Sequence, residues 1–134
     1  MNNLTEEDIL RILARSWNNL NVSLLEDILD THIIYQSQWV KNPIVGKKEV
    51  YTHLALKYNE IQKYLKLQKM VIIAEMAYFP RLENKPCLII TQKSLKFSHQ
   101  TTVLISCHNG LLKRINVCFE PHPMLAIFTG ETPK

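Results

Sequence analysis

The stretch HIIYQSQWV, at residues 32–40, marks the point where the hydrophobic pattern of the chain changes from helical to extended. It is rich in β-branched and aromatic residues and is too short for an amphipathic helix. A proline and a glycine follow shortly afterwards and end the extended pattern. Alternation along this predicted strand places four side chains on one face: Ile33, Tyr35, Ser37 and Trp39.

Upstream of this strand the pattern is helical. Thr5 is a favourable N-cap, and the three acidic residues that follow it suit the first turn of a helix. Apolar residues then recur at helical spacing as far as Leu20. A second capping pattern begins at Ser23 and predicts a short helix through Leu29.

Downstream of the strand, one more helix precedes a series of strands. The helix is expected from Lys47 to about Tyr64, with an apolar stripe made of Val50, Leu54, Tyr58, Ile61 and Leu65. The strands are expected at Leu67–Phe79, Cys87–Gln92, Thr101–Cys107 and Leu111–Glu120. Asn109-Gly110 separates the last two and predicts a type I′ hairpin turn.

This order of elements predicts a single α+β domain over residues 1–134. We expect a curved antiparallel β-sheet packed against three helices from the N-terminal half, forming a cone-shaped pocket. The core is expected at about residues 5–120, followed by a C-terminal tail at 121–134. Within that tail the apolar segment 124–128 could dock on another surface.

The composition is that of an ordinary globular domain. Of the 134 residues, 46% are hydrophobic and 21% are charged, which excludes disordered and low-complexity classes. No apolar run is long enough for a membrane span, and the first residues lack the apolar region of a signal peptide. The three cysteines contain no C-x-x-C pair, so we expect no disulfide framework and a reducing, cytoplasmic location.

The charge is distributed unevenly along the chain. Residues 1–40 carry two basic and six acidic groups, whereas residues 41–69 carry seven lysines and two acidic groups. These lysines are spaced out rather than clustered, which favours a solvated helix face over a nucleic-acid site. The five histidines show no metal-ligand spacing, so we predict neither a metal nor a cofactor.

The order and spacing of the elements resemble the nuclear transport factor 2-like superfamily, which includes ketosteroid isomerases and polyketide-cyclase-like proteins. The resemblance lies in residues 17–21, in the short helix at 25–30, in the strand ending at Val40, in Ile44–Val50, and in the hairpin at 109–115. It covers roughly residues 5–120 and implies the fold. The fold hosts enzymes, ligand-binding proteins and adaptors alike.

The resemblance also allows the isomerase mechanism to be tested residue by residue. That mechanism needs a carboxylate base, a tyrosine and a protonated acid. Matched by spacing, these positions fall at Ser37, Ala14 and about Leu104, none of which can perform the chemistry. We therefore expect no ketosteroid isomerase activity.

The resemblance places a pocket between the helices and the concave face of the sheet. The ligand-binding residues expected there are Trp17, Tyr35, Ser37, Trp39, Leu54, Tyr58, Ile115, Val117 and Phe119. Such a lining suits a small apolar or aromatic ligand. On the opposite face of the last strand, Arg114, Asn116 and Glu120 are expected to form a homodimer interface.

Three functions remain open on the sequence alone. The first is a small-molecule-binding domain without catalytic residues. The second is a polyketide-cyclase-like or isomerase-like enzyme that acts by proton transfer, with His53, Tyr35 and Ser37 as the candidate groups. The third is a protein-interaction module.

Overall fold

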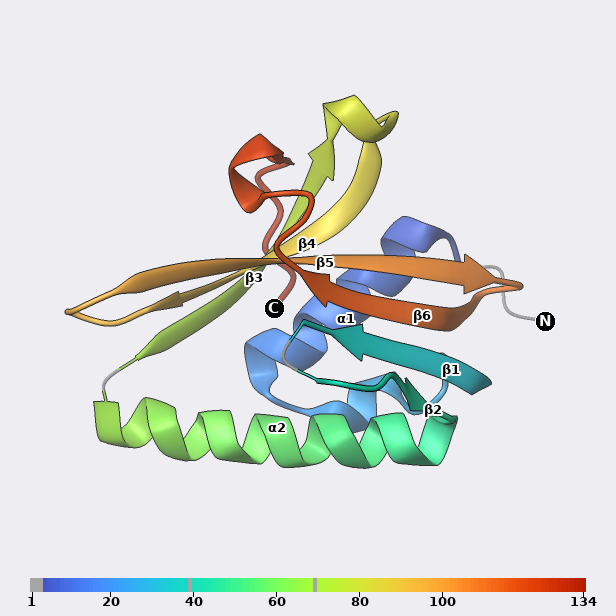
Figure 1. Cartoon of the computed structure of the whole chain (residues 1–134), viewed down its shortest axis with the longest axis horizontal. Helices are drawn as coiled ribbons and strands as arrows, with labels where there is room; N and C mark the ends of the chain where they lie inside the picture. The colour runs from blue at the N-terminus through green and yellow to red at the C-terminus, as the bar shows by residue number, and fades with distance from the viewer. Residues whose placement is uncertain (1–3, 39, 69) are drawn as a thin grey trace.

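The computed structural model describes residues 4–38, 40–68 and 70–134. Within these residues the chain forms two α-helices and one seven-stranded sheet, shown in Figure 1. The helices are α1 (Glu6–Asn19) and α2 (Lys47–Gln68), and three 3₁₀ turns are η1 (Val22–Leu25), η2 (Pro80–Leu82) and η3 (Pro123–Leu125). The strands are β1 (Leu29–Ser37), β2 (Ile44–Val45), β3 (Val71–Phe79), β4 (Lys85–Lys93), β5 (Ser98–His108), β6 (Leu111–Cys118) and β7 (Ile127–Phe128). The predicted α+β class is confirmed.

Helix α1 begins as the sequence predicts. The Thr5 side chain accepts a hydrogen bond from the backbone N–H of Asp8, and the Asp8 carboxylate accepts one from the N–H of Thr5. This reciprocal capping box satisfies two N–H groups that the first helical turn leaves free. The buried face of the helix carries Ile9, Leu13 and Trp17.

The prediction of three helices is wrong, because the second one is only a 3₁₀ turn. Asn21, rather than Ser23, caps this turn through a hydrogen bond from the Ser23 N–H to the Asn21 side chain. Only η1 and a short turn separate this cap from β1, which starts at Leu29. An α-helix therefore has no room to form, and the turn is anchored in the core by the buried Leu25, with Val22 packed beside it.

The strand bounds differ from the predicted ones by a few residues. Three further features also differ from the prediction. Helix α2 continues to Gln68, so Leu67 belongs to the helix and is 82% exposed rather than starting β3. The two-residue strand β2, which pairs with β1, was not expected, since it is too short to show alternation. The sheet is also not wholly antiparallel, because β1 pairs in parallel with β6.

The strands follow the order β2-β1-β6-β5-β4-β3-β7 across the sheet. Both helices lie on one side of it: α1 packs against β3, β4 and β5, and α2 packs against β1. The predicted hairpin turn is confirmed, because Asn109 and Gly110 both have positive φ, at 52° and 72°. The main core lies between the helices and the inner face of the sheet.

The C-terminal tail packs on its own chain. Strand β7 pairs with β3, and Ala126 packs on a second apolar cluster made of Ala77, Phe79, Cys87 and Ile89. Beyond β7, the Asn18 side chain donates a hydrogen bond to the carbonyl of Pro133. The tail therefore covers the edge of β3 and part of the outer face of the sheet.

Candidate functional site

The candidate site is a cavity of about 290 Å³ between the helices and the inner face of the sheet. Its lining comes from α1, α2, β4, β5 and β6, and consists of Trp17, Lys57, Ile90, Gln92, His99, Thr101 and Val117. Apolar and polar groups therefore line the same cavity, as is usual where a small molecule is bound. Among the described residues that line it there is no carboxylate.

Lys57 is the cationic group of this cavity. It lies on α2 next to the apolar stripe that carries Leu54 and Tyr58, so its aliphatic stem runs along buried surface. Its Nζ donates a hydrogen bond to the Tyr35 hydroxyl oxygen at 3.3 Å. The same Nζ lies 5.5 Å from the ring centroid of Trp17, within range of a cation–π contact.

The environment of Lys57 disfavours its charge. Burial lowers the pKa of the Lys57 amine below its ordinary value. Within residues 4–38, 40–68 and 70–134, no carboxylate lies within ion-pair distance of it. A partly buried cation without a counter-ion is unfavourable for stability.

Aromatic side chains support this amine from behind. The rings of Trp17 and Tyr58 meet edge to face with centroids 4.9 Å apart, and the Tyr58 hydroxyl shares a hydrogen bond with the Ser16 hydroxyl. Tyr35 is fully buried, and that burial raises its pKa to about 12, so its hydroxyl stays protonated at neutral pH. These contacts fix the position of the Lys57 amine on the cavity wall.

The residues predicted as a ligand-binding set divide into three groups. Trp17 and Val117 line the cavity itself. A second group is buried but does not line the cavity, and consists of Tyr35, Ser37, Leu54, Tyr58 and Ile115. Phe119 contacts the ring of His99, with centroids 5.4 Å apart, and Trp39 lies outside the described residues. Direct ligand contact by any of them stays a prediction.

Five of the seven lining residues were not predicted from the sequence: Lys57, Ile90, Gln92, His99 and Thr101. The sequences of β4 and β5 do contain a pattern from which the polar lining residues could have been predicted. Gln92 pairs with His99 in register, and both share a face with apolar neighbours such as Ile90 and Val103. Polar residues at inward positions of otherwise apolar strands indicate a cavity rather than a sealed core.

His53, a candidate catalytic base, lies behind the cavity rather than in its lining. Its ring is 4.8 Å from the ring of Tyr35, and its buried Nε2 has no hydrogen-bond partner among the described residues. Burial, and then the charge of Lys57, lower the pKa of His53, while Glu60 opposes them. His53 is therefore neutral at physiological pH, but Lys57 is the ionisable neighbour that reaches the cavity.

The predicted dimer residues lie on the outer face of the sheet. Arg114 donates hydrogen bonds to the side-chain oxygens of Asn116 and Gln36, at 3.3 and 2.5 Å. Glu120 is exposed just beyond β6. A shallow hollow of about 290 Å³ borders Gln36, Asn116 and Glu120.

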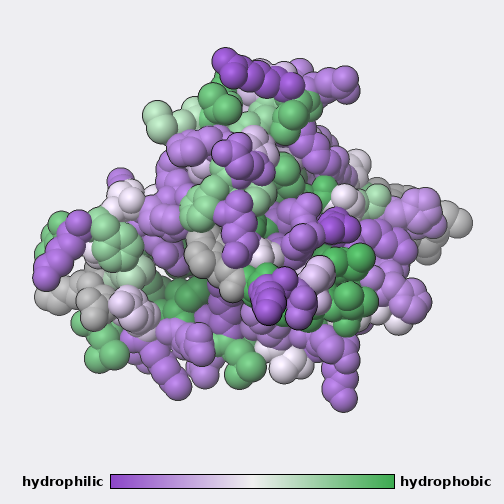
Figure 2. Space-filling view, viewed as in Figure 1, coloured by the Kyte–Doolittle hydropathy of each residue, from purple (hydrophilic) through white to green (hydrophobic). Residues whose placement is uncertain are grey.

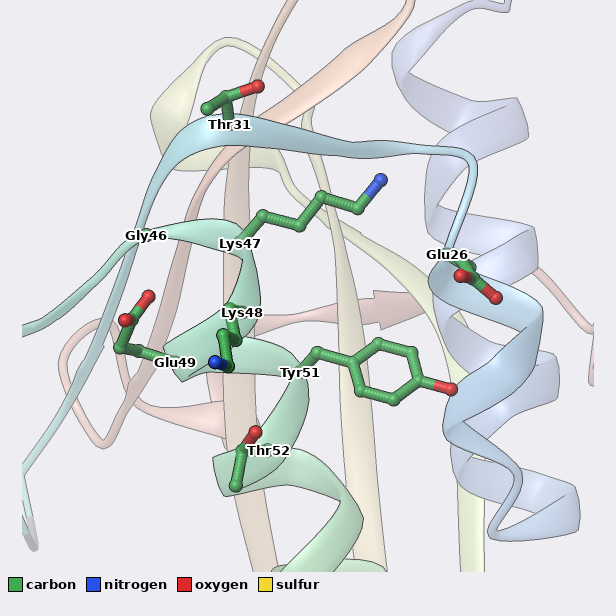
Figure 3. Close-up of a pocket in the computed structure, with 8 residues that line it drawn as sticks. All are labelled: Glu26, Thr31, Gly46, Lys47, Lys48, Glu49, Tyr51 and Thr52. Atoms are coloured by element: carbon green, nitrogen blue, oxygen red, sulfur yellow. The ribbon is translucent and has the colours of Figure 1, made fainter.

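A larger hollow, of about 540 Å³, lies at the start of α2 and is shown in Figure 3. Lys47 and Lys48 line it together with Glu26 and Glu49, so its charges balance. The Tyr51 side chain points from α2 towards the segment that carries Glu26. Most of its other side chains are exposed, which makes it a surface groove rather than an enclosed site.

Comparison with known proteins identifies the fold. No protein-family model matches the chain, and no curated protein matches it. Solved structures do match. One is an NTF2-like protein of unknown function from Cytophaga hutchinsonii, which superposes with a TM-score of 0.59 at 14% identity. The match covers 91% of this chain and 96% of that one. The chain has the NTF2-like fold.

Two other matches illustrate the range of the NTF2-like fold. A protein of ketosteroid isomerase-like fold from Catenulispora acidiphila, in complex with trimethylamine, has a TM-score of 0.55 at 11% identity over 84% of this chain and 85% of that one. A de novo designed protein with a curved β-sheet has a TM-score of 0.61 at 10% identity, covering 86% and 87% of the two chains. Identities this low support the fold alone.

Within the NTF2-like fold, the positions matched to the isomerase mechanism carry no suitable groups. Ala14 and Ser37 are buried, and neither bears a carboxylate or a phenol. Leu104 packs against the second apolar cluster, whereas its neighbour Val103 lies in the main core. Neither residue is an acid, so neither can serve as the protonated acid of that mechanism.

No group of three or more potential metal ligands occurs among the described residues. All three cysteines are free thiols. No helix in the described part of the chain is both long enough and apolar enough to cross a membrane.

Proposed function

We propose that the protein binds a small molecule in the cavity between its helices and its sheet, with Lys57 as the recognition group. The observation that carries the proposal is the position of the Lys57 amine. It lines the cavity, and no carboxylate among the described residues neutralises it. A ligand oxygen that accepts a hydrogen bond would supply the missing partner.

The remaining lining defines the shape and polarity of the ligand. Trp17, Ile90 and Val117 offer apolar surface to a flat or short aliphatic body. Gln92 and Thr101 add hydrogen-bonding groups from the sheet. The expected ligand is therefore small, with an apolar body and a carboxylate or carbonyl oxygen at one end. The trimethylamine held by the Catenulispora acidiphila protein shows that a protein of this fold can hold a small molecule.

A ligand-observed NMR screen tests the proposal. The compounds would be small aromatic and aliphatic carboxylates, aldehydes and ketones. Val117→Phe fills the cavity and is expected to abolish binding, whereas Val45→Phe makes the same change at an exposed position and should leave binding intact. Saturable binding that survives Val117→Phe would show that the ligand lies elsewhere.

A proton-transfer enzyme is a second candidate function. It is favoured by the contact between Lys57, which lines the cavity, and Tyr35, one of the groups predicted for that chemistry. Turnover of a carbonyl compound that is lost in both Lys57→Met and Tyr35→Phe would support this function over simple binding.

We also propose a homodimer formed through the outer face of the sheet. A polar network already lies there, formed by Arg114, Asn116 and Gln36. Leu104 lies between this network and the second apolar cluster. Exposed apolar side chains of the tail border this face: Met124, Leu125, Ile127 and Phe128. Figure 2 shows apolar groups lying among polar ones over this part of the molecule.

A further inference from the structure

We propose that Lys57 captures a small aldehyde or ketone as an imine, so that the ligand of the cavity is a carbonyl compound. This inference rests on the proposed function and names its substrate class. The position of the Lys57 amine and the composition of the surrounding wall carry it.

The contacts of the Lys57 nitrogen place it for reaction. Nζ lines the cavity and donates one hydrogen bond, to the Tyr35 hydroxyl oxygen at 3.3 Å. The Trp17 ring face lies on a second side, 5.5 Å away from Nζ to the centroid. These contacts leave room for the nitrogen lone pair to face the cavity once the amine is neutral.

The protonation state of the amine also favours reaction. An exposed lysine has a pKa near 10.4, so roughly one amine in a few thousand is neutral at pH 7. Burial lowers the pKa of Lys57, and no carboxylate contact in the described part of the chain restores the charged form. Each unit by which a lysine pKa falls raises its neutral fraction at pH 7 about tenfold. A desolvated lysine in an apolar setting is a recognised nucleophile towards carbonyl groups.

Imine formation at Lys57 balances without any further reactant. The neutral amine attacks the carbonyl carbon and forms a carbinolamine. Both amine hydrogens end on the former carbonyl oxygen, which leaves as water as the C=N bond forms. Tyr35 acts as a positioning residue, since it holds the amine from behind and does not line the cavity.

The wall opposite the amine suits this reaction. Gln92 and Thr101 provide polar groups in the same cavity, where they can hydrogen-bond the carbonyl oxygen before it leaves. Trp17 and Val117 provide apolar surface for the body of the carbonyl compound. A carboxylate is the competing ligand class. It would pair with the charged form of the Lys57 amine, whereas imine formation needs the neutral form.

Reductive trapping tests the inference. The full chain is incubated at pH 7 with benzaldehyde and sodium cyanoborohydride, digested, and labelling is quantified at each lysine by mass spectrometry. Lys63 is the internal control, because it lies on the same helix and is exposed. We expect Lys57 to be labelled at least tenfold faster than Lys63, with the ratio shrinking as the pH approaches the ordinary lysine range. Labelling of Lys57 no faster than Lys63 would overturn the inference.

Two variants distinguish imine formation at Lys57 from a purely electrostatic role of its charge. Lys57→Arg keeps a cation but cannot form an imine, so the fast label should vanish, whereas Lys63→Arg should leave it unchanged. Tyr35→Phe removes only the hydroxyl and should alter the pH profile of Lys57 labelling without changing that of Lys63. An unchanged profile would remove Tyr35 from the positioning role.

A parallel titration with benzoate and benzyl alcohol distinguishes this inference from the proposed function. Binding of either compound that Val117→Phe abolishes, without fast labelling of Lys57, would overturn the imine and leave the binding function standing. Binding of benzoate alone would assign the cavity to carboxylates instead. If neither compound binds and Lys57 is not labelled fast, both proposals are contradicted.

Discussion

The burial of the Lys57 amine is expected to lower the free energy of unfolding of the protein. Replacing it by methionine keeps the length of the stem and removes a partly buried charge that has no counter-ion among the described residues. We expect Lys57→Met to raise the free energy of unfolding by about 1 kcal/mol, since apolar replacements of poorly compensated buried charges are often stabilising. Urea denaturation measures this, and Lys63→Met on the exposed side of the same helix should change stability by less than about 0.5 kcal/mol. A marked loss of stability in Lys57→Met would mean that the lysine serves the fold.

His53 predicts a dependence of stability on pH. Its pKa is lowered in the folded state by burial and by Lys57, against the opposing charge of Glu60. As the pH falls below about 6.5, the ordinary histidine value, the unfolded chain binds a proton that the folded chain does not. The free energy of unfolding should therefore decrease between pH 7 and pH 5. In His53→Gln that decrease should be smaller, while in His108→Gln, at the exposed end of β5, it should match the wild type. Equal decreases in both variants would contradict the assignment.

At the scale of elements, the sequence predicts Thr5 as the N-cap of α1, and the structure confirms it. Thr5→Ala removes the side-chain acceptor for the Asp8 N–H and should lower the free energy of unfolding by about 1 kcal/mol. Thr52→Ala, at an exposed position of α2, is the matched control and should be neutral or slightly stabilising. Thermal unfolding of the two variants makes the comparison. Equal melting temperatures would show that the cap contributes nothing.

Elements with a long periodic signal were predictable, and the shortest ones were not. The apolar stripe of α2 and the Asn109-Gly110 turn were both readable, because periodicity and turn chemistry are local properties. The parallel pairing of β1 with β6 depends on residues far apart in the chain, and no local pattern encodes it. Lys57 was missed for a related reason: α2 carries four other lysines, and only the tertiary packing shows which lysine is covered.

At the scale of the whole molecule, the outer face of the sheet determines the expected assembly. Arg114→Glu would place like charges across a two-fold axis and should shift a homodimer towards monomer. Size-exclusion chromatography with light scattering measures the mass. Lys134→Glu makes the same charge change at the exposed end of the tail and should not alter the mass. A wild-type protein that is monomeric at all concentrations would contradict the dimer.

The central claim is that a ligand binds between the helices and the sheet, at Lys57. The most direct test is a crystal structure of the protein with the tightest compound from the screen. We predict that the compound lies between Trp17 and Val117, with a ligand oxygen or an imine carbon bonded to the Lys57 Nζ. A compound bound instead in the groove at the start of α2 (Figure 3), with the cavity empty, would contradict this claim.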